Sequence, residues 1–506
     1  MDIPGTIAGL PVTGIGNNAF FESLQLSGVS IPDSVISIGT NAFEACIAMT
    51  SASMGTNVTT IDDNAFLGCV ALPTVAIPTK VANIGTNAFA SCRKLVSVSI
   101  SSNVTNIGTG AFANCSSLIG ITVDSLNPVY KSVNGVLFNQ IQTTLLQSPQ
   151  DFTGEFTIPS GTTVISDQAF QYCSNLTGVI IPDSVTNMGN STFAYCTDLT
   201  NAVLGSNIMS IGTSAFFSCL SLVNVTLPYG LTIIGDSAFE YCGSLTNLVM
   251  PNTVTNTGNS TFAYCTNLVG AILSSNITTI GDDLFFNCGN LHSVAIPLGV
   301  TVVGNSAFCN DASISSAIIP SGVTSIGIEA FGGCSLTTLS IGNSVTNIGG
   351  WAFSGCISLA ANVIIASSVV TIGESGFSND WRVPAYFFLG NAPVLSGPDS
   401  IWNNHSATAY YLPGTSGWTN VLDAIPAVLW NPQAQTQDGS FGVQNSQFGF
   451  NITGTPNIPI AIQGCTNLAE STWTTLQSCL VTNGSIYFSD PQYLNFPSRL
   501  YRIGSP

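Results

Sequence analysis

The chain has very little charge, and basic residues are the scarcest of the charged residues. Only 6% of its 506 residues are charged, and 7 Lys and Arg stand against 25 Asp and Glu, so the formal net charge at pH 7 is -18. Binding to phosphate-rich polymers requires Lys and Arg to neutralise the phosphates. We therefore expect no nucleic-acid partner and no attachment to an anionic membrane.

Long apolar runs are missing as well. No stretch approaches the roughly 18 uninterrupted apolar residues of a membrane-spanning helix, so we expect no membrane insertion. The opening letters, MDIPGTIAGLPVTGIG, have neither the basic flank nor the apolar run of a signal peptide. An export segment, if the natural protein has one, is therefore expected to lie upstream of this chain or to have been removed.

Side chains that commonly carry catalysis are rare. Only His292 and His405 can serve as imidazole bases, and each is isolated, which favours surface or loop positions. No CxxC pair occurs, and the Asp pairs at 62–63 and 282–283 fit corner caps better than a cation site. We expect no catalytic residue, no metal and no cofactor, and a polysaccharide-cleaving enzyme ranks third among the possible functions.

What the chain has instead is one unit written many times. The letters GNSTFAYCT occupy residues 189–197 and again 258–266, and the offset (258 − 189 = 69) is three times 23. A second series, around the Ile of "IP", extends the count to about eighteen coils. The first series is a Phe that recurs in steps of 23, except for single steps of 58, 22 and 24: Phe20, Phe43, Phe66, Phe89, Phe112, Phe170, Phe193, Phe216, Phe239, Phe262, Phe285, Phe308, Phe331, Phe353 and Phe377.

Each unit contains a strand pattern and a turn pattern. In the unit that begins at Leu95, Val98 and Ile100 alternate as in a strand, whereas Phe112 and Cys115 are spaced as in one helical turn. Gly lies four residues before the Phe in 13 of the 15 coils, which suits a corner of positive φ or a cap. One coil cannot bury its apolar edge alone, so stacking against neighbours supplies the stability, at roughly 1.5–3 kcal/mol per large buried side chain.

Cysteine follows the same repeat. Spacing that follows the coil, and no metal-ligand motif, predicts a buried ladder of thiols that act as small apolar fillers, and parallel side chains one coil apart oppose the disulfide torsion. In the tail, a disulfide between Cys465 and Cys479 and two free thiols both remain open. Twelve of the 15 cysteines lie three residues after the Phe: Cys46, Cys69, Cys92, Cys115, Cys173, Cys196, Cys219, Cys242, Cys265, Cys288, Cys334 and Cys356.

The repeat carries a family resemblance. The pattern L-x-x-V-x-I-P followed by S-V-T-x-I-G-x-x-A-F-x-x-C resembles the BspA-type leucine-rich repeats over residues 1–383. The resemblance implies a leucine-rich-repeat solenoid with a parallel β-sheet on one face and short helical turns and loops on the other. It also implies a secreted or surface protein of bacteria that adheres to other macromolecules and has no catalysis.

Three segments depart from the 23-residue pattern. The step of 58 holds an insertion at about residues 124–157, in which Asn134 and Gly135 read as a two-residue hairpin turn, and we expect this hairpin to project from one rim. Residues 384–431 read as degenerate terminal coils. Residues 432–506 read as a small antiparallel β module, and this tail resembles C-terminal modules found behind such repeats in secreted bacterial proteins.

A candidate binding surface follows from strand alternation, because the residue before each "IP" position points outward. In the early coils these residues are mostly small or polar, among them Ser30, Ser53, Ser99 and Thr122. In later coils we predict a row that binds a partner, formed by Ile180, Val203, Val249, Ile272, Ile318, Ile364, Phe388 and Tyr411. The row also has two simpler interpretations: β-propensity alone favours Ile and Val in strands, or the tail module folds back over the row.

The sequence therefore predicts an extracellular, non-catalytic scaffold that recognises a protein or a glycan through its sheet face. A purely structural spacer, or a surface protein that self-associates without a specific ligand, is the alternative from another class.

Overall fold

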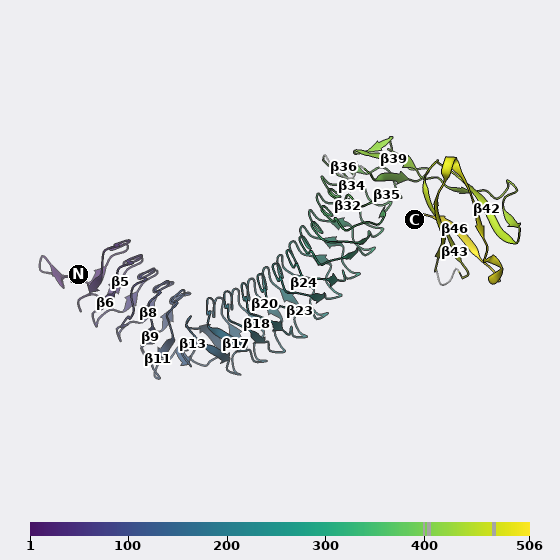
Figure 1. Ribbon diagram of the computed structural model, residues 1–506. Helices are drawn as coiled ribbons and strands as arrows, with labels where there is room; N and C mark the ends of the chain where they lie inside the picture. Colours follow the sequence, from purple (N-terminus) through teal and green to yellow (C-terminus); the bar gives the residue numbers. More distant parts are fainter. Residues whose placement is uncertain (398–399, 402–405, 468–471, 506) are drawn as a thin grey trace. The chain divides into compact units, whose positions relative to one another are not determined.

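The chain folds as a β-solenoid of about 17 turns with parallel sheets and almost no helix, which confirms the predicted fold class (Figure 1). The computed structural model describes residues 1–397, 400–401, 406–467 and 472–505. The chain forms two compact units, Met1–Gly299 with Asn310–Ser313, and Val300–Cys309 with Ile314–Pro506. In the described part of the chain, no helix is long and apolar enough to cross a membrane.

Most coils of the first unit contribute a strand just before the "IP" position. These strands pair in parallel with the next coil, so that Val98 lies beside Ile121 and Val179 beside Ala202. The series consists of β4 (Gly28–Ser30), β6 (Ser51–Ser53), β9 (Ser97–Ile100), β11 (Gly120–Val123), β15 (Gly154–Thr157), β17 (Leu176–Ile180), β19 (Asn201–Val203), β21 (Asn224–Val225), β23 (Asn247–Val249), β25 (Gly270–Ile272) and β27 (Ser293–Val294).

A second, two-residue strand in most of these coils was not anticipated from the sequence. It precedes the repeated Gly and gives each coil a second parallel sheet. The series consists of β3 (Gly14–Ile15), β5 (Ser37–Ile38), β7 (Thr60–Ile61), β8 (Asn83–Ile84), β10 (Asn106–Ile107), β16 (Val164–Ile165), β18 (Asn187–Met188), β20 (Ser210–Ile211), β22 (Ile233–Ile234), β24 (Asn256–Thr257) and β26 (Thr279–Ile280). At the amino end, β1 (Thr6–Ile7) and β2 (Leu10–Pro11) form a hairpin.

The second unit repeats both series. Its first series is β29 (Ser316–Ile318), β31 (Thr338–Ser340), β33 (Val363–Ile365), β35 (Ala385–Phe388), β37 (Thr408–Tyr411) and β39 (Ile425–Leu429), and β38 (Val421–Leu422) pairs antiparallel with β39. Its second series is β28 (Val302–Val303), β30 (Ser325–Ile326), β32 (Asn347–Ile348), β34 (Thr371–Ile372) and β36 (Val394–Leu395).

The same unit ends in antiparallel strands. They are β40 (Gln433–Ala434), β41 (Gly442–Gln444), β42 (Gln447–Thr453), β43 (Pro459–Cys465), β44 (Thr474–Leu480), β45 (Ser485–Asp490) and β46 (Leu500–Gly504), with the 3-10 turns η2 (Thr482–Gly484) and η3 (Tyr493–Asn495). One sheet contains β40, β41, β42 and β45, and the other has the order β44-β43-β46. These strands enclose a small apolar core, in which Ile452, Ile460, Ile462 and Phe488 are buried.

The predicted helical turns are wrong in detail, because the Phe segments form tight turns and not helices. In the coil of Phe89, Ala88 N–H donates to Gly85 O and Cys92 N–H donates to Phe89 O, which are three-residue bonds. Left-handed residues two before and two after the Phe, Asn87 at φ 53° and Ser91 at φ 60°, interrupt any helix. The corner is thereby folded without an α-helical turn.

The repeated Gly serves a close approach between coils and does not have the positive φ that was one of our two expectations, beside a cap. Gly108 has an ordinary φ, but a Cβ there would lie 2.3 Å from Thr86 N in the preceding coil. The same holds at Gly212, where it would lie 2.6 Å from Gly189 O. A side chain at this corner would force neighbouring coils apart, which explains the recurrence of Gly.

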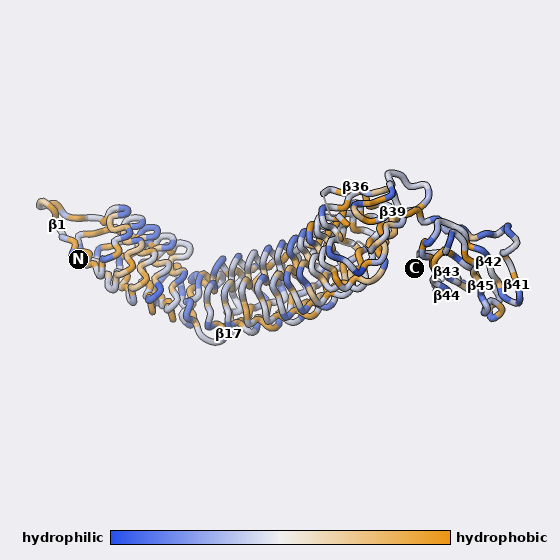
Figure 2. The backbone as a smooth tube through the Cα atoms, turned by 45° about the horizontal axis from the view of Figure 1, so that its top comes forward, coloured by the Kyte–Doolittle hydropathy of each residue, from blue (hydrophilic) through white to orange (hydrophobic). Residues whose placement is uncertain are grey.

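The interior is built from identical residues that stack coil on coil. Phe43, Phe66 and Phe89 are fully buried, and successive rings lie 5.1 and 5.2 Å apart at interplanar angles of 13° and 4°. The tube in Figure 2 alternates between apolar and polar segments along the coils, as an interior that repeats at every coil requires. This shared apolar interior is what the 23-residue period encodes.

The insertion packs against the solenoid and does not project from a rim as we expected. Its hairpin consists of β12 (Tyr130–Val133) and β13 (Val136–Asn139), joined by Asn134 and Gly135 at φ 52° and 83°. A third strand, β14 (Thr144–Gln147), pairs in parallel with β16 of the next coil. The β13 residues 136–138 are buried, so the hairpin takes the place of coil interior.

Candidate partner-binding face

The outward row runs along the first strand series of each unit. In the first unit, Val203, Val249 and Ile272 are exposed, the latter two by 61% and 64%, whereas Ile180 is half-buried. In the second unit, Ile318 and Ile364 are exposed. Each unit therefore presents β-branched aliphatic side chains to solvent from several of its coils, whereas Thr226, Ala295 and Ser340 hold the same position in others.

A groove lies beside this row in the first unit. It has a volume of about 900 Å³, and Thr226, Tyr229, Val249 and Ile272 are among the residues that line it. The sheet is interrupted at this point, because β21 ends one four-stranded sheet and β23 begins the next sheet. The groove thus lies where the first strands of two neighbouring coils do not pair.

Polar groups flank the apolar row. Asn201, Asn224 and Asn247 lie two residues before the row on successive strands, and all three are exposed. At the groove, Asp183 accepts the N–H of Ser206 at 2.7 Å, which lowers the pKa of Asp183. None of the described residues that line the groove is basic. The face therefore offers apolar contact and amide hydrogen bonds, without a cationic site.

The predicted positions of Phe388 and Tyr411 in the row are wrong. The strand register places Phe388 beside the inward residue Ile365, and Tyr411 continues the same line. Phe388 is only 2% exposed and contacts Trp418 edge-on at 5.0 Å, and Tyr411 stacks on the same Trp418 ring at 4.8 Å. The error arose because we placed the next outward residue 24 positions after Ile364, whereas the strands pair at a step of 23, as Ile365 and Phe388 do. The extra residue shifted the alternation of inward and outward side chains by one.

The true continuation of the row in the second unit is covered by the chain itself. Phe387 lies beside Ile364 and Tyr410 beside Phe387, and the two rings stack at 5.0 Å. Tyr410 packs against the core of the C-terminal strands together with Trp430, whose Nε1 donates to Pro459 O at 2.8 Å. The antiparallel strands therefore cover the end of the row, where Tyr410 is half-buried, whereas Ile318 and Ile364 of the same row stay exposed.

The twelve ladder cysteines are all buried, and they are hydrogen-bond donors as well as fillers. In the regular coils each Sγ lies near the carbonyl of the Phe in the preceding coil, as in Cys69 to Phe43 O at 3.2 Å and Cys219 to Phe193 O at 3.1 Å. Burial raises the pKa of Cys69 and Cys115 to about 12. These thiols are therefore neutral and shielded, which suits structure and not nucleophilic chemistry.

Sequence reasoning missed two carboxyl groups in the same ladder. Asp311 and Asp380 lie three residues after Phe308 and Phe377, at the position that holds Cys in most other coils, and both are fully buried. Asp311 accepts the N–H of Cys288 at 2.6 Å, and Asp380 accepts that of Cys356 at 2.8 Å. Burial raises their pKa to about 9 and about 8. Their position three residues after the repeated Phe was the signal in the sequence that could have identified them.

The remaining candidates fall outside any site. His292 is exposed, with its ring near Asn290 O, and His405 lies outside the residues that the structure describes. Asp63 caps the next coil by accepting the Thr86 N–H at 2.7 Å. Cys465 and Cys479 are free thiols that lie opposite Leu500 and Ile460 on the antiparallel sheet. Across the described residues, no cluster of three or more possible metal ligands occurs.

The repeat pattern decides the family. The model described as "BspA type Leucine rich repeat region (6 copies)" matches residues 13–143, 139–208, 188–315 and 301–391. The chain belongs to the BspA-type leucine-rich repeat family. This BspA-type chain is accordingly a repeat scaffold, in which every coil contributes its own residues to the surface. A search of curated proteins found no match.

Several solved structures are similar to this BspA-type chain. A leucine-rich cell surface protein from Faecalibacterium prausnitzii is 28% identical over 53% of this chain and 86% of its own, with a TM-score of 0.43. The pneumococcal vaccine antigen PcpA is 19% identical over 67% and 88%, with a TM-score of 0.45. A leucine-rich repeat protein from Bacteroides ovatus is 23% identical over 85% and 91%, with a TM-score of 0.40. The family assignment depends on the repeat match alone.

Proposed function

We propose that this protein is an extracellular, non-catalytic scaffold that binds a protein partner through the sheet face of its first unit. The observation that carries the proposal is the groove at Thr226, Tyr229, Val249 and Ile272, where exposed aliphatic side chains lie beside a row of amides. An apolar row flanked by side-chain amides suits a polypeptide, which offers apolar side chains and backbone hydrogen-bonding groups together. The cell-surface relative supports the proposed location.

The second unit supplies an internal precedent for this use of the face. There the row continues as Phe387 and Tyr410, and the chain's own antiparallel strands pack against Tyr410 and Trp430. A folded β structure therefore already covers the equivalent surface in this molecule. The row in the first unit is also apolar, but aliphatic where the covered row is aromatic, and it is exposed at Val203, Val249 and Ile272.

The proposal is tested by the double substitution Val249→Ser and Ile272→Ser. We expect at least a tenfold loss of affinity in biolayer interferometry against a panel of purified matrix proteins, because burial of the two side chains would be lost. The matched control is Leu220→Ser with Ile233→Ser, which changes two aliphatic residues that are 50% and 45% exposed away from this row. Equal loss in both double variants, or unchanged binding in the first, contradicts the proposal.

Two further functions remain as outcomes of the same experiment. A glycan partner would appear as binding to polysaccharides measured in the same way beside the protein panel, with the same sensitivity to Val249 and Ile272. A structural spacer or self-associating surface protein would bind nothing on the panel. Self-association would then show as light scattering that rises with protein concentration and falls in the double variant.

A further inference from the structure

The insertion interrupts a ladder of backbone hydrogen bonds that joins the Phe turns. In a regular coil, three N–H groups of each turn donate to carbonyls of the next coil. The coil of Phe89 is an example: Asn87 N–H donates to Thr109 O at 3.1 Å, Phe89 N–H to Ala111 O at 2.8 Å, and Ser91 N–H to Ala113 O at 2.7 Å. These N–H groups therefore all point along the stack toward the following coil.

The next turn, around Phe112, has no such neighbour. Among the residues that the structure describes, no hydrogen bond uses the N–H of Gly110, Phe112 or Asn114. Phe112 is fully buried, and a buried N–H without a partner is costly unless water or a ligand satisfies it. A chain edge with three open donors thus faces the insertion.

On the far side of the insertion the ladder resumes. Ser148 N–H donates to Ala169 O at 2.7 Å, and the side-chain amide of Gln150 donates to Gln171 O at 3.2 Å. Gln150, which is only 6% exposed, thereby replaces the backbone donor of a regular turn. Residues 148–150 form a shortened turn that bonds forward, and within the described chain none of its hydrogen bonds reaches back to the turn of Phe112.

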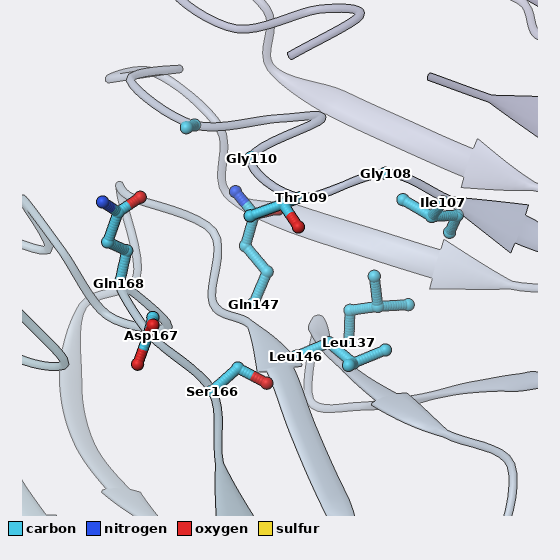
Figure 3. A pocket seen from close by; sticks show the side chains of 11 residues that line it. Ile107, Gly108, Thr109, Gly110, Leu137, Leu146, Gln147, Ser166, Asp167 and Gln168 are labelled. Carbon is cyan, nitrogen blue, oxygen red and sulfur yellow. The ribbon is translucent and has the colours of Figure 1, made fainter. Parts of the chain in front are cut away.

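Two cavities mark this interruption. One, of about 340 Å³, lies between Gly108–Gly110 and Ser166–Gln168, with Gln147, Leu137 and Leu146 from the insertion on its wall (Figure 3). The other, of about 570 Å³, lies between Asn114 and Tyr172 on the outer side of the same turns. It is lined by Ser91, Arg93, Asn114, Ser116, Gln150, Tyr172, Ser174, Tyr195 and Thr197.

Tyr172 gives the second cavity an aromatic wall. It stacks on Tyr195 of the next coil at 4.6 Å and 11°, and that is its one ring contact in the described chain. Tyr195 covers one face of the Tyr172 ring, and Tyr172 lines the cavity together with Asn114 and Gln150. Tyr172 also has φ 63°, a left-handed conformation that bulky residues rarely adopt and that Asn114 holds one turn earlier. Tyr172 thus has a strained backbone conformation and places its aromatic side chain at the edge of the second cavity.

We propose that this second cavity is a saccharide-binding site, and that Arg93 makes it prefer a sugar that bears a carboxylate. The apolar face of a sugar ring packs on the free face of Tyr172, while the hydroxyls reach the amide of Asn114, its open N–H, and the hydroxyls of Ser91 and Ser116. Arg93 is exposed, and within the described chain its guanidinium makes no ion pair. A guanidinium binds a carboxylate through paired hydrogen bonds, and none of the lining residues is acidic.

Isothermal titration with two oligosaccharides tests the proposal, one ending in glucuronate and its neutral counterpart ending in glucose. We expect tighter binding of the acidic sugar. The substitution Tyr172→Ala should weaken both sugars at least tenfold, because it removes the stacking surface. The substitution Arg93→Gln should abolish the preference for the acidic sugar and leave affinity for the neutral one within about twofold.

Tyr241→Ala is the matched control. Tyr241 has φ 60°, is 37% exposed against 41% for Tyr172, and stacks on Tyr264 at 4.4 Å, but it lies outside the cavity. Thermal melts of the two Tyr variants should agree, so a difference in binding reports the cavity and not the fold. Absence of binding by both sugars at millimolar concentration, or equal weakening by Tyr172→Ala and Tyr241→Ala, overturns the proposal. The sheet-face variants Val249→Ser and Ile272→Ser should bind both sugars normally, which separates this site from the proposed partner-binding face.

Discussion

The coils before the insertion and those after it have the same interior and different outer faces. In both regions each Phe ring stacks on the Phe ring of the next coil. The ring centroids of Phe43 and Phe66 lie 5.1 Å apart, and those of Phe193 and Phe216 lie 5.3 Å apart. On the outer face, Ser99 and Thr122 join their hydroxyls at 2.8 Å, whereas Val249 and Ile272 are bare aliphatic side chains. Stacking holds the interior constant, and only the outer face is free to change, so the change there is where function is to be sought.

The largest expected effect tests whether the two interiors are equivalent. Phe66→Ala and Phe216→Ala each remove a fully buried ring from a stack, and each should lower the free energy of unfolding by about 3–5 kcal/mol. Urea unfolding followed by circular dichroism measures both. A cost below about 1 kcal/mol in one region alone would show that the two interiors differ.

A second prediction concerns the coils in which Asp takes the place of the ladder Cys. Asp311 keeps a raised pKa of about 9, so between about pH 4 and pH 9 the folded chain holds a proton that the unfolded chain has released. Stability should therefore be greatest at acid pH and fall as pH rises toward 9. Asp311→Cys should be more stable than the parent by several degrees in Tm at pH 8 and should show a shallower decline.

The control for this prediction keeps the acceptor and removes the titration. Asp311→Asn retains the side-chain oxygen that receives the Cys288 N–H. Asp380, with a pKa of about 8, contributes its own decline, so the double substitution Asp311→Cys and Asp380→Cys should flatten the profile further. Thermal melts from pH 4 to pH 9 with unchanged slopes in all three variants would contradict the assignment.

A smaller effect is expected for the thiols. Cys69→Ala and Cys219→Ala each delete a buried donor to a Phe carbonyl, and each should cost about 1–2 kcal/mol, with the same value before and after the insertion. Cys219→Ser is the control that keeps a donor. Urea unfolding measures the three variants, and a cost near zero for both Ala variants would show that the thiol bonds add nothing.

The smallest effect on stability is expected on the outer face. Ser53→Ile with Ser99→Ile, and the reverse change Val249→Ser with Ile272→Ser, should each alter the free energy of unfolding by about 0.5 kcal/mol or less, because these side chains are exposed. The first pair should increase binding of an apolar dye, and the second should decrease it. A large loss of stability in either pair would mean that the outer face is part of the packed structure.

Much of the fold could be predicted because every coil states the same constraints. A 23-residue step places Phe beside Phe and Cys beside Cys, so the interior ladders, the parallel strands before "IP" and the family follow from the letters alone. The second strand series was missed because two residues carry too little periodicity to recognise. The recurrence of Gly was noticed, but its cause, a coil-to-coil approach at Gly108, needed neighbouring backbones to be in place.

The sequence by itself determined the repeat, its length and its interior, because one coil buries its apolar edge only against an identical neighbour. The tertiary structure decided which side chains reach the surface. A one-residue difference in register turned Phe388 inward under Trp418 and placed Phe387 and Tyr410 on the outer face, where other strands cover Tyr410. It also decided where hydrogen bonds end, at Asn114 beside the insertion. Which side chains lie on the surface, and where the hydrogen-bond ladder ends, depend on which coils pair. That pairing is set by contacts between residues far apart in the chain.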